Sequence, residues 1–213
     1  MKKLITLLVL LSFTIKAQTI VVANEKLLWP DVTIGTQTWT SINLHVKKYR
    51  NGDKIPQVQD EKAWAKLKTG AWCYYENKKE NGSTYGKLYN WFAVNDKRGL
   101  APKGYHIPSA AEWNILTESL GGKSQAGTEM KSKYGWNNNG NGTNTSGFAA
   151  LPGGYRFYYN GSFLDIGSVS LWWSSSQAYA SVASYFYLDA KNGNLGSSGF
   201  FLQTGHSVRC IKD

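Results

Sequence analysis

Apolar residues in the first half of the chain recur at helical spacing. A first run of this kind predicts a short helix over residues 61–68, with Asp60 as its N-cap. A second run, over residues 85–94, places apolar side chains three and four positions apart and predicts another helix. The pattern therefore predicts short amphipathic helices in the first half of the chain.

The clearest helix start lies at Ser109. This residue can act as the N-cap while Glu112, three positions later, completes a capping box. Trp113, Leu116 and Leu120 then fall on one face, before a glycine that ends the helix. We expect these three side chains to be buried, with Trp113 in the core rather than at a ligand site.

The second half of the chain alternates short apolar runs with turn residues. Asn-Gly dipeptides supply the positive φ angles of tight hairpins. Two hairpins are predicted across such dipeptides: residues 155–159 with 163–166, and residues 184–190 with 195–202. Residues 206–211 would close the same sheet. The fold class that follows is α+β, with a late antiparallel sheet.

The N-terminus has the three parts of a secretory signal peptide. Lys2 and Lys3 form the basic start, residues 4–15 the apolar region, and Ala17 the small residue before cleavage. A cytosolic N-terminal helix is the alternative. The apolar region is shorter than the roughly 18–20 residues that span a bilayer, so no transmembrane segment is predicted. We expect an exported protein, whether periplasmic, cell-surface or secreted.

The remaining chain reads as one domain without a linker or low-complexity segment. The predicted division is a signal peptide (1–17), a short N-terminal lead (18–31) and the domain (32–213). With 42% hydrophobic and 14% aromatic residues, the chain can bury a sizeable core. A lipid anchor would need a cysteine directly after the apolar region, and the first cysteine is Cys73.

The net charge is +10, with 24 Lys and Arg against 14 Asp and Glu. The signal peptide holds three of the lysines and no acid, so the mature chain carries +7. The lysines are scattered, and no nucleic-acid-binding motif accompanies them. We therefore predict no nucleic-acid partner.

Known catalytic and metal-binding motifs are missing from the sequence. The three histidines and two cysteines show no metal-ligand spacing, and no Gly-x-Ser-x-Gly or phosphate-binding loop occurs. The stretch 135–147 is rich in Gly and Asn but lacks Asp and Glu, so it reads as a polar surface loop rather than a calcium site. No catalytic residue, metal site or cofactor is predicted.

Cys73 and Cys210 are the only cysteines. An even number in an exported chain favours a disulfide, with two buried free thiols as the alternative. The bond would close a loop of well over a hundred residues and would be structural.

Two adjacent tryptophans are the most unusual candidates for a binding surface. Alternation along a strand sends Trp172 and Trp173 to opposite faces, so one is expected in the core and the other exposed. An exposed ring with polar neighbours suits the apolar face of a sugar, although packing alone is the alternative explanation. The predicted ligand-binding residues are Trp172, Trp173, Tyr155 and Tyr158.

Many motifs in order resemble one family, the Fibrobacter succinogenes major paralogous domain of exported bacterial proteins. They are VTIGxQxW (32–39), YRNGD (49–53), YGKLYNW (85–91), GYHIPS (104–109), GFAALPGGYR (147–156), WWSS (172–175) and SVRCIKD (207–213). Residues 104–113 also resemble a signature of the sulfatase-modifying enzymes. That second resemblance implies a C-type-lectin-like fold, with two or three short helices packed on a twisted antiparallel sheet with long loops.

The resemblance limits the chemistry that can be carried over. The catalytic cysteine pair of the sulfatase-modifying enzymes has no counterpart in this chain, and the E-P-N and W-N-D calcium motifs of sugar-binding lectins are missing. We expect a non-enzymatic binding or adhesion module that recognises a glycan or a cell-envelope partner without calcium. The alternatives are an extracellular enzyme on this scaffold and a structural envelope-interaction domain. The sequence predicts no oligomeric state.

Overall fold

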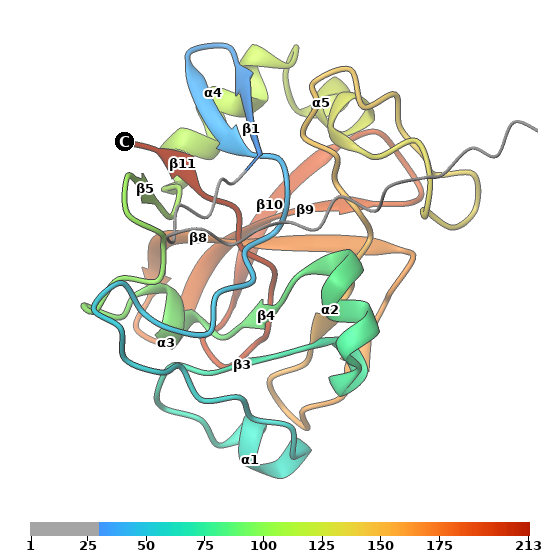
Figure 1. Cartoon of the computed structure of the whole chain (residues 1–213). Helices are drawn as coiled ribbons and strands as arrows, with labels where there is room; N and C mark the ends of the chain where they lie inside the picture. Colours follow the sequence, from blue (N-terminus) through green and yellow to red (C-terminus); the bar gives the residue numbers. More distant parts are fainter. Residues whose placement is uncertain (1–29) are drawn as a thin grey trace, which may run out of the picture.

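The computed structural model describes residues 30–213 (Figure 1). The predicted signal peptide, and all but the last two residues of the predicted lead, lie outside this range. Within it, no helix has both the length and the apolar character needed to cross a membrane.

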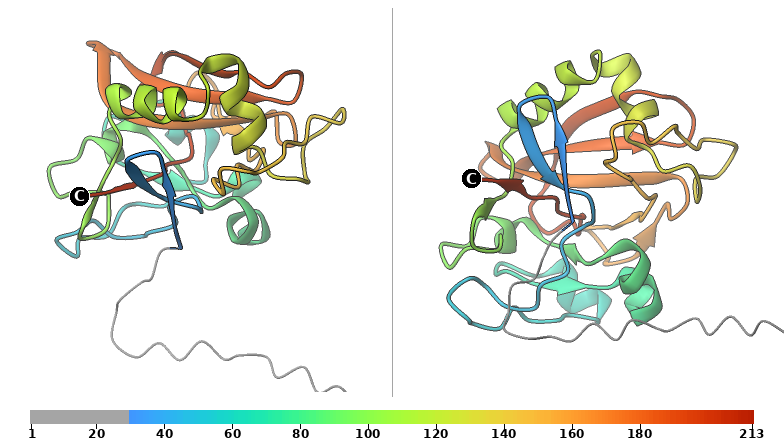
Figure 2. Two further views of the ribbon diagram at one scale, coloured as in Figure 1. Left: turned by 90° about the horizontal axis from the view of Figure 1, so that it is seen from above. Right: turned by 45° about the horizontal axis from the view of Figure 1, so that its top comes forward.

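The longest strands form a three-stranded antiparallel sheet. Its order is β10-β9-β8, and the strands are β8 (Val169–Tyr179), β9 (Val182–Asp189) and β10 (Leu195–Phe201). Leu195 pairs with Leu188, which confirms the hairpin predicted across Asn192-Gly193. Two helices, α4 (Ala110–Ser119) and α5 (Lys123–Met130), lie along one face of this sheet (Figure 2).

A second sheet joins segments that are far apart in the sequence. Its order is β1-β2-β11-β5, and the strands are β1 (Asp31–Ile34), β2 (Gln37–Thr40), β11 (Ile211–Lys212) and β5 (Tyr105–His106). The prediction that residues 206–211 close the sheet of the hairpins is therefore wrong. Ser207 makes only an isolated bridge with Trp172, and the last strand pairs instead with β2 and β5.

Two short ladders complete the β structure of the described residues. They are β3 (Trp72–Cys73) with β4 (Leu88–Tyr89), and β6 (Tyr155–Arg156) with β7 (Phe163–Leu164). The second ladder is the other predicted hairpin, with shorter strands. Gly161 supplies the positive φ of 74° in its turn, and the Asn160 side chain accepts a hydrogen bond from the Ser162 amide.

Local capping signals identified two helices correctly. Asp60 caps α1 (Glu61–Ala65), and Ser109 with Glu112 forms the capping box of α4. Trp113 and Leu116 are fully buried on the inner face of α4, as predicted. The sequence pattern did not predict α5.

The helix predicted over residues 85–94 is wrong. The segment is divided among the end of α2 (Lys79–Tyr85), strand β4 and α3 (Trp91–Val94). Gly86, at φ 79°, ends α2, and the Asn90 side chain starts α3 by accepting from the Ala93 amide. A 3-10 turn, Tyr75–Asn77, precedes α2.

The fold class is mixed α and β, as expected, but the finer description needs correction. The described residues contain five short α-helices rather than two or three, and several small antiparallel sheets rather than one. Their buried side chains form three apolar clusters.

A buried arginine joins the two halves of the chain. Arg209 is 1% exposed, and it donates to the Asn43 side chain and to the carbonyl oxygens of Thr40 and Phe148 at 2.7–2.9 Å. Its guanidinium also lies 4.3 Å from the centre of the Phe148 ring. These contacts fix the last residues of the chain against the N-terminal sheet.

Candidate functional site

Strand β9 has two unlike faces. Phe186 and Leu188 are buried on the side of α4, where the Phe186 ring stacks on Trp113 at 5.0 Å. Tyr185, Tyr187 and Asp189 alternate with them and point to the opposite side of the sheet. That side is where the candidate site lies.

A cavity of about 200 Å³ opens on this side of the sheet. We call it the aromatic pocket. Its aromatic side chains are Tyr155, Tyr185, Tyr187 and Phe200, and the others that line it are Asp165, Val169, Leu171 and Asp189. Sites for drug-sized ligands hold roughly 300–1,000 Å³, so the aromatic pocket suits one small ring or one unit of a longer molecule.

The small residues of β10 create room for these rings. Gly196 pairs with Tyr187, and a Cβ atom at that glycine would lie only 2.3 Å from Cζ of the tyrosine. Ser198 pairs with Tyr185. A larger residue in place of Gly196 would displace a wall of the pocket.

The phenols of Tyr155 and Tyr185 are protonated at neutral pH. Burial raises the pKa of Tyr185, and its hydrogen bond with Ser198 offsets part of that rise. Burial also raises the pKa of Tyr155, and the nearby Asp165 adds to the effect. Each hydroxyl can therefore donate a hydrogen bond to a ligand.

Three aromatic rings that are exposed or half-buried lie next to the pocket. Tyr158, Tyr159 and Phe201 form what we call the aromatic shelf. The rings of Tyr158 and Phe201 lie 4.3 Å apart, and Tyr158 is 5.9 Å from Phe200 in the pocket wall. Tyr159 is 76% exposed and Phe201 is 40% exposed. The contact between Tyr158 and Phe200 places the shelf next to the pocket.

The structure brings two of the four predicted ligand-binding residues to this surface. Tyr155 lines the pocket, and Tyr158 lies on the shelf. Sequence reasoning missed Tyr185, Tyr187 and Asp189. Their alternation along one strand was a signal that could have placed all three on the same face.

The two tryptophans need a correction. Trp172 and Trp173 do point to opposite faces of β8, but both are fully buried, and neither ring is exposed as predicted. Trp172 packs against Phe148 and donates to the Asn43 side chain. Trp173 donates to the Tyr89 carbonyl oxygen. Its face of β8 is therefore covered by β4.

The predicted disulfide is also wrong. Cys73 and Cys210 are buried free thiols, and they belong to different apolar clusters. Burial raises the pKa of each thiol to about 12. Both side chains are therefore thiols of the core, the alternative that the sequence left open.

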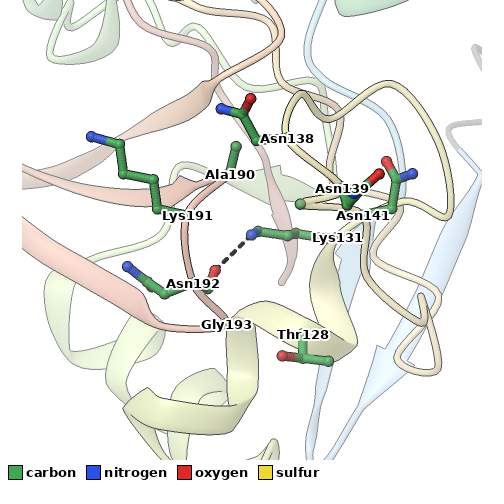
Figure 3. A pocket seen from close by; sticks show the side chains of 10 residues that line it. Thr128, Lys131, Asn138, Asn139, Asn141, Ala190, Lys191, Asn192 and Gly193 are labelled. Carbon is green, nitrogen blue, oxygen red and sulfur yellow. Dashed lines mark hydrogen bonds between the residues drawn. The ribbon is translucent and has the colours of Figure 1, made fainter.

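The Gly- and Asn-rich loop forms part of a second, polar cavity of about 250 Å³ (Figure 3). Asn138, Asn139 and Asn141 are exposed, as expected for a surface loop. The buried Lys131 ammonium donates to the carbonyl oxygen of Asn192 at 2.6 Å and also to that of Asp189. This lysine holds the β9–β10 turn against the end of α5.

A third cavity, of about 370 Å³, is lined in part by His106 and Glu112. His106 lies between two carboxylates, with Nε2 2.8 Å from Glu112 and Nδ1 2.8 Å from Asp213. Ionised carboxylates only accept hydrogen bonds, so the imidazole donates to both of them only in its protonated form, and, against the effect of burial, the two contacts raise its pKa. In that form neither nitrogen can take a further proton.

The described residues show no arrangement of side chains that could form a metal site. Among residues 30–213, no group of three or more His, Cys, Asp or Glu side chains could hold an ion.

These observations define the class of protein: a mixed α and β domain of small antiparallel sheets, with an aromatic pocket on the sheet face opposite its longest helices. The chain belongs to the Fibrobacter succinogenes major domain family, whose model matches residues 32–212. This confirms the family resemblance seen in the sequence motifs. No curated protein and no solved structure matches the chain.

Proposed function

We propose that the protein is an exported, non-enzymatic carbohydrate-binding module that works without calcium on a C-type-lectin-like scaffold. Its binding site is the aromatic pocket together with the aromatic shelf. The observation that carries the proposal is a pocket lined by four aromatic rings and two carboxylates.

The chemistry of the pocket suits a sugar. A pyranose ring has apolar C–H faces that pack on aromatic rings, and hydroxyl groups around its edge that need hydrogen-bond partners. Tyr155, Tyr185 and Tyr187 offer both a ring and a hydroxyl. Asp165 and Asp189 offer acceptors that need no metal ion.

The shelf favours a polymer over a free monosaccharide. The pocket has room for about one ring, and Tyr158, Tyr159 and Phe201 continue the aromatic surface outside it. A glycan chain could place one unit in the pocket and its neighbours on the shelf. Stacking of each further unit would add affinity.

Export fits the state of the cysteines. Two free thiols in an oxidising compartment are safe only if they cannot react. Cys73 and Cys210 are both buried, and burial raises the pKa of each to about 12, so very little thiolate is present.

The test is binding of the purified protein to a glycan array and to insoluble polysaccharides, with and without EDTA. Tyr185→Ala removes a pocket wall, and Tyr134→Ala is the matched control, since Tyr134 is 69% exposed and does not line the pocket. We expect EDTA-resistant binding that Tyr185→Ala weakens at least ~30-fold, the effect of losing a central contact, and that the control retains. Absence of binding by the wild type would contradict the proposal and favour a protein partner in the envelope.

A further inference from the structure

His206 is held rigidly beneath the aromatic pocket. Its side chain is fully buried. Its backbone amide donates to the Tyr89 carbonyl oxygen at 3.0 Å, and its carbonyl oxygen accepts from the Tyr89 amide at 2.8 Å. The main chain at this position is therefore satisfied and well fixed.

Four aromatic rings surround the imidazole. Trp173 stacks on it with ring centres 4.1 Å apart. The other three rings are those of Tyr185 at 5.0 Å, Phe200 at 5.6 Å and Tyr155 at 6.1 Å. These three also line the aromatic pocket, so the side chains that form its walls cover His206.

Neither ring nitrogen of His206 has a hydrogen-bond partner among the described residues. Burial lowers the pKa of the imidazole well below its usual value of 6.5, so the ring is neutral at physiological pH. It then holds one N–H donor and one acceptor that nothing uses. A buried polar group without a partner destabilises a fold, and a phenylalanine would fill an aromatic cage without that cost.

Resting on the proposed carbohydrate-binding function, we infer that His206, behind the pocket walls, determines specificity by forming a hydrogen bond with one hydroxyl of the bound sugar. The rings of Tyr185 and Phe200, with centres 5.7 Å apart, lie between the pocket and the imidazole, so this contact requires the two rings to move apart. A hydroxyl fixed directly on a pyranose ring lies close to the ring edge. An exocyclic hydroxymethyl group projects farther, so the ligand class is a hexopyranoside rather than a pentopyranoside.

Matched sugars test this inference without knowledge of the natural glycan. Methyl glycosides of glucose, galactose and mannose are compared with those of xylose, L-arabinose and lyxose, which share their ring hydroxyl patterns but lack the hydroxymethyl group. NMR titration of the wild type gives each affinity. The ¹⁵N shifts of the His206 imidazole report whether its nitrogens gain a partner.

We expect one hexoside to bind roughly 10–100-fold more tightly than its matched pentoside and to shift the His206 nitrogens. His206→Phe should lose that preference while its melting temperature stays equal or rises. His206→Gln, which keeps a donor and an acceptor, should retain part of it. Equal affinity within every pair, or an unchanged preference in a folded His206→Phe, would overturn the inference.

The two proposals fail in different ways. If the wild type binds neither the polysaccharides nor the glycosides, both are overturned. If Tyr185→Ala weakens binding and a folded His206→Phe keeps the hexoside preference of the wild type, only the role of His206 is overturned. Should His206→Phe fail to fold, the ¹⁵N shifts in the wild type decide, because ligand binding that leaves them unchanged excludes a hydrogen bond to the imidazole.

Discussion

Replacement of His106 by glutamine should lower stability in a pH-dependent way. The imidazole links the start of α4, through Glu112, to Asp213 near the end of β11. Partial burial disfavours the charge on His106, but the hydrogen bonds to Glu112 and Asp213 together outweigh it and raise the pKa above 6.5. Glutamine keeps a similar length but cannot carry the positive charge.

The size of the effect follows from exposure. The side chains of His106, Glu112 and Asp213 are 40%, 29% and 57% exposed, so solvent screens both ion pairs. Exposed pairs contribute about 0.2–1 kcal/mol each, which gives a loss of about 1 kcal/mol for His106→Gln. For a domain of this size, such a loss lowers the melting temperature by about 2–4 °C.

The sign of the pH dependence follows from the two shifts. Because the pKa of His106 is raised on folding, its contribution is complete below pH 6.5 and disappears as the pH rises through the folded pKa. Burial opposes ionisation of Glu112, but the hydrogen bonds from Ser109 and His106 outweigh it and lower the pKa. Its contribution is therefore complete above pH 4.5 and is lost as the pH falls through the folded pKa.

Urea unfolding of the wild type, His106→Gln, Asp213→Asn and the double variant at pH 6 and pH 9 gives the coupling energy. Asp213→Asn is the useful partner, because Glu112 also caps α4. We expect coupling at pH 6 that vanishes at pH 9 and weakens with added salt. A difference in unfolding free energy between wild type and His106→Gln that is the same at both pH values would contradict a role for the charged imidazole.

Three further predictions concern the core. Arg209→Met should cost about 3–5 kcal/mol, because it removes three hydrogen bonds from a buried guanidinium to buried oxygen acceptors; urea unfolding measures the loss, and a value below 1 kcal/mol would contradict it. Trp172→Ala should cost about 3–5 kcal/mol, because the side chain is fully buried, and Tyr159→Ala should cost less than about 0.5 kcal/mol, because the side chain is exposed. Similar losses for the two variants would contradict this difference in burial. Cys73 and Cys210 should react with a thiol reagent only after unfolding, and a peptide map with the two linked would be inconsistent with two free thiols.

Local signals in the sequence were reliable where a few neighbouring residues decide the structure. The capping box at Ser109 is an example, since its hydrogen bonds lie within four residues. The apolar spacing over residues 85–94 misled because it ignored Gly86 and Asn90, which end one helix and begin another. Apolar residues at helical spacing share one face only if a single helix runs through all of them without interruption.

The candidate site was harder to predict because burial depends on distant segments. Alternation correctly sent Trp172 and Trp173 to opposite faces, but it could not show that both faces are covered. Tyr155 lines the pocket because Gly154, the residue before it, forms a β-bridge with Ser170 of β8 and so places β6 beside the three-stranded sheet. Such neighbours are set by topology, which one sequence does not display.

The pairing of the last strand with one of the first affects how the chain can fold. Ile211 pairs with Trp39, and the Thr40 amide donates to the Cys210 carbonyl oxygen at 2.9 Å. Contacts between residues so far apart in sequence form slowly, since a long loop must close first. The N-terminal sheet therefore cannot be completed until residues 210–212 have been synthesised. For a protein proposed to be exported, a sheet that is still incomplete during synthesis favours export before folding.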